Sequence, residues 1–62
     1  MKFFDYSKGV IESYCDNPQD VSPNILRSAL RDAQRYYKNG MATKDWLEYI
    51  EQTLTPYIEQ TN

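Results

Sequence analysis

One stretch constrains the fold of this chain more than any other, because it holds a helical pattern between a start signal and a stop signal. It runs from Ser22 to Gly40. Serine caps helix N-termini with its hydroxyl, and Pro23 fits the first helical position because no needed backbone donor is lost there. The Asn39-Gly40 pair enters the left-handed backbone conformation at low cost, which ends a helix. The sequence therefore predicts a helix over residues 23–39.

This predicted central helix has two opposite faces. Apolar residues fall on one continuous arc at helical spacing: Ile25, Leu26, Ala29, Leu30, Ala33, Tyr36 and Tyr37. Basic residues fall on the other side: Arg27, Arg31, Arg35 and Lys38. The apolar face requires a core, and the basic face requires solvent or an acidic partner.

A first helix is predicted over residues 3–16, since its apolar residues share one half of the helical wheel. They are Phe3, Phe4, Tyr6, Val10, Ile11, Tyr14 and Cys15. Gly9 falls on the polar side of this helix, where no packing reason for a glycine is visible. Pro18 then disfavours helical geometry at Asn17, so a short connection should follow and bring the first two helices side by side.

A third helix is predicted over residues 44–59. Thr43 is positioned to cap it, and Asp45 in its first turn complements the helix dipole. Its apolar stripe comprises Leu47, Ile50, Leu54, Tyr57 and Ile58, with Trp46 at the edge. Pro56 either bends this helix or breaks it, in which case Thr55 caps a separate short helix. The predicted fold is all-α, a small three-helix bundle forming one domain over residues 1–62.

Composition excludes several kinds of chemistry. Cys15 is the only cysteine and the chain has no histidine, so it can form neither an internal disulfide nor a Cys/His zinc site. We expect no metal and no cofactor. The usual general base is absent, and the carboxylates of the third helix face outward, where their pKa values are not raised for acid catalysis. We therefore expect a protein that is not an enzyme, with Cys15 as a small buried apolar residue.

The N-terminal residues and the cysteine content favour a cytoplasmic location. Asp5 interrupts the apolar start of the chain before a signal peptide core could form, and no stretch approaches a membrane span. A single unpaired cysteine also fits a reducing compartment.

Charge and aromatic residues supply the candidate binding residues. The net charge is −2, but the central helix is mostly basic and the third helix is mostly acidic. The basic residues Arg27, Arg31, Arg35 and Lys38 suit contacts with carboxylates or phosphates, although they also fit a solvated face or one balanced by the acidic third helix. Trp46 and Tyr49 are the candidates for an exposed aromatic anchor.

These features favour a small accessory or regulatory protein that acts by stoichiometric binding to another protein, as an inhibitor or adaptor of the kind that bacteria and phages use. Two alternatives stay open. The basic face of the central helix is also suited to nucleic acid, although a helix-turn-helix arrangement is disfavoured because phosphates would repel the acidic third helix. The wide apolar arc of the first helix would also suit self-association into a structural module.

Overall fold

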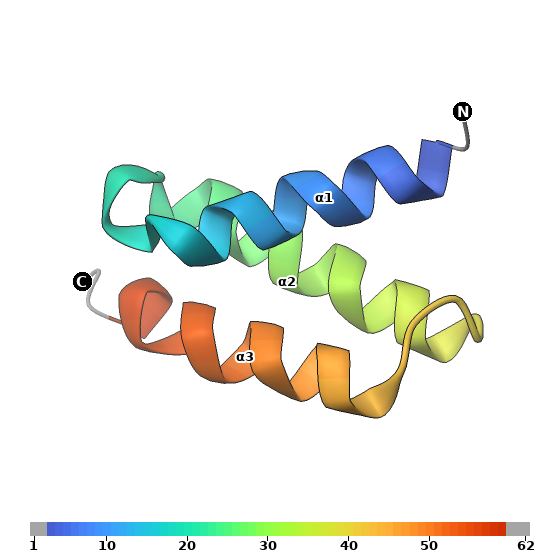
Figure 1. Cartoon of the computed structure of the whole chain (residues 1–62). Coiled ribbons are helices and arrows are strands. Elements are labelled where there is room, and N and C mark those ends of the chain that lie inside the picture. Colours follow the sequence, from blue (N-terminus) through green and yellow to red (C-terminus); the bar gives the residue numbers. More distant parts are fainter. Residues whose placement is uncertain (1–2, 60–62) are drawn as a thin grey trace.

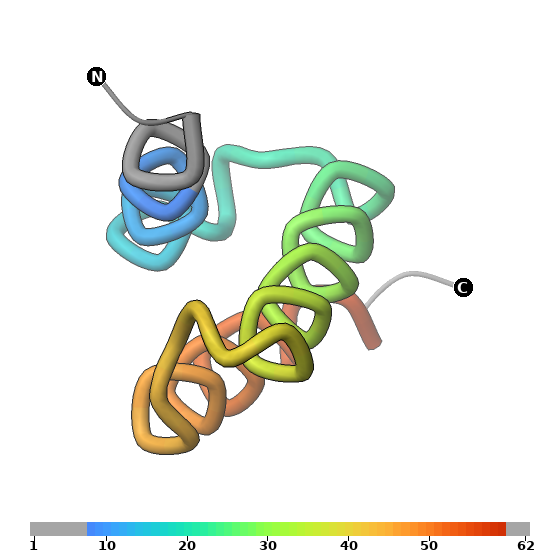
Figure 2. Tube along the Cα trace, turned by 90° about the vertical axis from the view of Figure 1, so that its right-hand side faces the viewer, coloured from blue at the N-terminus to red at the C-terminus, as the bar shows by residue number. Residues whose placement is uncertain are grey.

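A computed structural model describes the backbone of residues 3–59 and the side chains of residues 8–59. Three α-helices follow one another in it: α1 (Phe3–Asp16), α2 (Pro23–Lys38) and α3 (Lys44–Glu59), with a short 3-10 helix, η1 (Pro18–Asp20), between the first two. Neighbouring helices run in opposite directions (Figure 1). Seen from the side, the helices do not share one layer, and α1 and α3 lie on the same side of α2 (Figure 2). The predicted three-helix bundle is confirmed.

The start of α2 lies where the sequence predicts it, but its capping differs in one respect. Ser22 is the N-cap residue and Pro23 follows at the first helical position. The Ser22 carbonyl accepts a hydrogen bond from the Leu26 backbone N–H at 3.0 Å. The Ser22 side chain makes no capping hydrogen bond, so the predicted hydroxyl cap is absent.

The end of α2 is closed by two backbone hydrogen bonds around Gly40. The Gly40 N–H donates to the Tyr37 carbonyl at 3.0 Å, and the Met41 N–H donates to the Tyr36 carbonyl at 2.8 Å. These are the two bonds of a Schellman motif, which needs a left-handed residue after the helix. Gly40 supplies it with φ of 76°. The predicted stop signal is confirmed.

The start and the course of α3 settle two further predictions. The Thr43 hydroxyl accepts a hydrogen bond from the Trp46 backbone N–H at 3.1 Å, as expected of an N-cap. Pro56 lies inside α3, which continues to Glu59. Of the two alternatives at Pro56, a separate short helix is therefore excluded. Its ring is on the exposed side of the helix.

All three helices contribute residues to the hydrophobic core. Its buried members are Ile11, Cys15, Leu26, Ala29, Ala33, Ile50 and Leu54. The most extensive helix contact is between α2 and α3. Burial of Cys15 agrees with its predicted structural role. The predicted core positions Phe3, Phe4 and Tyr6 lie outside the described side chains.

Two members of the predicted apolar arc of α2 are exposed. Ile25 is 46% exposed and Tyr37 is 41% exposed. Ile25 lies at the edge of the arc that faces α1, and Tyr37 lies in the last turn of α2, so neither reaches the middle of the bundle. The helical period placed both residues on the apolar side of α2 correctly, but the buried part of that side is narrower than predicted.

Candidate functional site

The basic side chains of α2 form an exposed face, which we call the basic face: Arg27, Arg31, Arg35 and Lys38. It lies opposite the buried side of α2, where Leu26, Ala29 and Ala33 pack. This arrangement follows directly from the 3.6-residue period of the helix. The helix therefore presents its positive charge away from the core.

Two of these side chains bind polar partners within α2. Arg35 forms an ion pair with Asp32, with 2.8 Å between Nη2 of Arg35 and Oδ1 of Asp32. Arg27 donates a hydrogen bond to the Asn24 side-chain oxygen at 3.0 Å. Both contacts are local, three residues apart, and both lie at the surface, where such pairs contribute little to stability.

The acidic third helix does not balance the basic face. Across residues 8–59, the Arg35–Asp32 contact is the only ion pair between side chains that the structure shows, and no carboxylate of α3 lies within 4 Å of a basic group of α2. The polar link between these helices is instead a hydrogen bond from the Gln34 amide to Glu51 at 3.2 Å. Arg31 and Lys38 are thus exposed cations for which residues 8–59 provide no ion-pair partner.

Trp46 packs between α3 and α1. Its indole Nε1 donates a hydrogen bond to Oε2 of Glu12 at 2.8 Å, and the Lys8 ammonium lies 5.2 Å from the centre of its ring. The side chain is half-buried against the core. Trp46 therefore differs from the exposed anchor that the sequence predicted, because its ring links α3 to α1.

Tyr49 is exposed, as predicted, and lies next to the Cys15 thiol. Its side chain is 49% exposed. Burial raises the pKa of the Cys15 thiol, the charges of Asp16 and Glu12 raise it further, and a hydrogen bond from Tyr49 partly opposes the rise. The pKa of the Tyr49 phenol is also raised, first by Cys15 and then by desolvation. The Cys15 thiol is therefore held in its neutral form at physiological pH.

The six predicted binding residues do not share one surface. Trp46 and Tyr49 face α1, through Glu12 and Cys15. The basic face lies on the outside of α2. A partner that contacts the basic face would therefore need an apolar anchor point other than Trp46 and Tyr49, and whether those two bind a partner stays a prediction.

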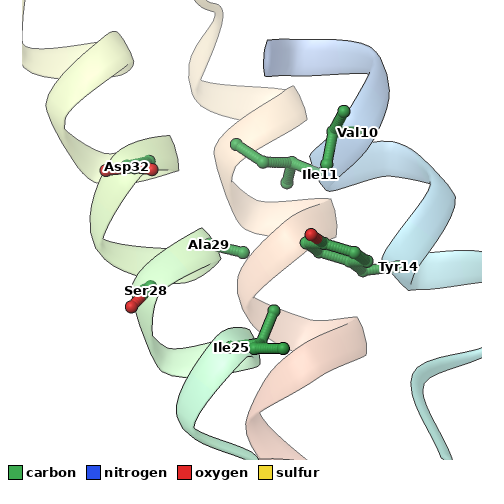
Figure 3. A pocket seen from close by; sticks show the side chains of 7 residues that line it. All are labelled: Val10, Ile11, Tyr14, Ile25, Ser28, Ala29 and Asp32. Atoms are coloured by element: carbon green, nitrogen blue, oxygen red, sulfur yellow. The ribbon is translucent and has the colours of Figure 1, made fainter. Parts of the chain in front are cut away.

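Such an anchor point exists between α1 and α2. An open groove of ≈ 180 Å³ is lined by Val10, Ile11, Tyr14, Ile25, Ser28, Ala29 and Asp32. Ile25 and Ala29 project from α2 toward the Tyr14 ring on α1 (Figure 3). Sequence reasoning missed this groove because it assigned every apolar residue of both helices to the core. The position of Ile25 at the edge of the arc was the available signal.

Comparison with known proteins found no matching family model, no matching curated protein and no matching solved structure. Within the described part of the chain, no helix combines the length and the apolar character that a bilayer crossing demands. The same residues contain no cluster of three Cys, Asp or Glu side chains suited to a metal ion.

Proposed function

We propose that this protein acts by stoichiometric binding to another protein, through the basic face of α2, without catalysing a reaction. The observation that carries the proposal is the exposure of Arg31 and Lys38, for which the structure of residues 8–59 shows no carboxylate neighbour. Arginine on a rigid helix suits bidentate contacts with carboxylates, and a helix holds its charges at fixed spacing. An inhibitor or adaptor role fits this mode of action.

The charge distribution supports a protein partner over nucleic acid. The chain as a whole carries a net charge of −2, and Asp45, Glu48 and Glu59 are exposed on α3. A polyanion that approaches the basic face also experiences this negative field, which weakens non-specific attraction to phosphates. A protein with a small acidic patch avoids that repulsion.

The free thiol supports a reducing compartment, which for this proposal is the cytoplasm. Cys15 is buried and unpaired. Thiols in such positions persist where glutathione and thioredoxin keep cysteines reduced.

Capture from a lysate of the source cells, treated with nuclease, tests the proposal. The immobilised wild-type chain is compared with Arg31→Glu and with Lys44→Glu. The second variant makes the same change of charge at an exposed position of α3. We expect one protein to be retained in about equimolar amount by wild type and by Lys44→Glu, and to be depleted about tenfold or more by Arg31→Glu.

Three outcomes contradict the proposal. If a protein is retained from untreated lysate but not from nuclease-treated lysate, the basic face binds nucleic acid instead. If wild type, Arg31→Glu and Lys44→Glu all retain the same protein, the basic face does not contact that protein. Recovery of additional copies of the chain alone identifies a self-associating module.

A further inference from the structure

The groove between α1 and α2 is apolar at its floor yet open to solvent. Val10 and Tyr14 are half-buried on the α1 side, Ala29 is buried at the bottom, and Ile25 is 46% exposed on the α2 side. Residues 25–32 of α2 span about two helical turns, or roughly 10 Å of helix axis. A groove of that length accepts two or three apolar side chains from a partner helix at i, i+4 and i+7 spacing.

Ile25 occupies a position where a different residue would stabilise the helix better. It is the third residue of α2, and Ser22 is the N-cap. Glutamate at this position would complete a capping box with Ser22 and would also favour the helix dipole. The chain instead places an exposed β-branched apolar side chain there, next to a serine hydroxyl that caps nothing. Helix capping therefore does not explain Ile25, and the exposed 46% of its side chain leaves apolar surface for a partner.

The charges around the groove are unequal on its two sides. On the α1 side, Ser13 follows Val10 by three positions, which places it next to Val10 on the helix surface, and it is exposed and uncharged. On the α2 side, Arg31 and Arg35 follow the groove residues Ser28 and Asp32 by three positions, which places them next to these residues on the helix surface.

The one carboxylate of the groove, Asp32, is already paired with Arg35 at 2.8 Å. The charge left on this side is the Arg31 guanidinium, for which the described part of the chain shows no ion-pair partner. The α2 side of the groove is therefore positive, and acidic groups complement it.

We propose that this groove receives the apolar face of an amphipathic helix from the partner protein, and that acidic side chains flanking that face contact Arg31. The inference rests on the proposed function and names the partner's chemistry. A second copy of this chain is a poor occupant. Its acidic helix α3 already buries Ile50 and Leu54 in its own core, so these two apolar side chains are not available to fill the groove.

A synthetic peptide of about four helical turns, capped at both ends, serves as the probe. Its Leu residues follow i, i+4, i+7 spacing with Glu on both flanks, and a matched peptide carries Lys in place of Glu. Binding is followed by ¹⁵N–¹H correlation spectra of the ¹⁵N-labelled chain. We expect the Glu peptide to shift the amide signals of Val10, Tyr14, Ile25 and Ala29, and to bind about tenfold more tightly than the Lys peptide.

Matched variants connect this binding to the groove. Ile25→Glu and Arg31→Glu should each weaken binding of the Glu peptide about fivefold or more, because each removes an anchor and adds like charge. Met41→Glu and Lys44→Glu, at exposed positions outside the groove, should leave it within about twofold. Since Ile25→Glu should not lower the melting temperature, a loss of binding in this variant is not a loss of fold.

Several results overturn the inference: equal binding of the two peptides, no binding of either, or signal shifts confined to residues outside the groove. Self-association that Ile25→Glu abolishes assigns the groove to a second copy instead. If, in the lysate capture, the partner is retained by Ile25→Glu but not by Arg31→Glu, that result would contradict the groove inference and would still support the proposed function. Retention of the partner by both variants would contradict both the groove inference and the proposed function.

Discussion

The indole Nε1 of Trp46 donates a hydrogen bond to Oε2 of Glu12 at 2.8 Å, and this contact joins α3 to α1. The hydrogen bond between Tyr49 and the Cys15 thiol joins the same two helices. A chain of 62 residues has a small core and a low free energy of unfolding. One such hydrogen bond therefore contributes a measurable part of that free energy.

Loss of the Glu12 carboxylate should therefore lower stability. Glu12→Ala removes the acceptor and leaves the indole N–H to water, at a cost of about 0.5–1.5 kcal/mol in the free energy of unfolding. Urea unfolding followed by circular dichroism measures the change. Glu48→Ala, an exposed carboxylate on the back of α3, is the matched control and should unfold like wild type. Equal loss in both variants would show that the bond to Trp46 contributes nothing.

Stability should fall at alkaline pH because of Cys15. Burial holds the pKa of its thiol above the ordinary value of 9.0. The folded state therefore binds this proton more tightly than the unfolded state does. The resulting stabilisation is complete below pH 9.0 and is lost as the pH rises through the higher pKa of the folded state.

Urea unfolding at pH 8 and pH 10 measures this effect, and Cys15→Ala should show a smaller fall between the two pH values. The intact thiol should also react slowly with a disulfide reagent at pH 8 and rapidly in urea. Fast reaction in the native state would contradict the burial of Cys15.

The two glycines should respond to alanine in opposite directions. Gly9 lies inside α1 with open space around it, so Gly9→Ala should stabilise the fold by about 0.5–1 kcal/mol. Gly40 has φ of 76°, and Gly40→Ala should destabilise the fold by about 1–2 kcal/mol. Thermal unfolding of the two variants beside wild type measures both. A change of the same sign in both would contradict the backbone geometry at one of them.

Removal of Pro56 should stabilise α3. Proline has no N–H to donate to the Gln52 carbonyl, and it lies on the exposed side of a continuous helix. Pro56→Ala restores that donor and should raise the free energy of unfolding by about 1–3 kcal/mol. A decrease, measured by thermal unfolding, would mean that the proline ring contributes more by restricting the unfolded chain.

The helices were predictable because their signals are local. Ser22 with Pro23, Asn39 with Gly40, and Thr43 each mark a helix end through backbone or capping chemistry that depends only on nearby residues. The 3.6-residue period also placed Arg31 on the outside of α2 and Ala33 in the core. These features need no knowledge of the other helices.

The candidate site was only partly predictable, because it depends on how the helices pack. The sequence gives no measure of how far α1 lies from α2 at Ile25, and this spacing decides whether the side chain is buried or lines a groove. Trp46 was expected to be exposed, and the structure places it against Glu12, 34 positions earlier in the chain. Long-range contacts of this kind require the fold.

The central claim is that the basic face of α2 binds a protein partner. Isothermal titration of the chain with the captured protein, purified free of nucleic acid, tests it most directly. The account predicts a one-to-one complex, an affinity at least about tenfold weaker for Arg31→Glu, and an affinity within about twofold of wild type for Lys44→Glu. Equal affinity of all three chains would contradict it.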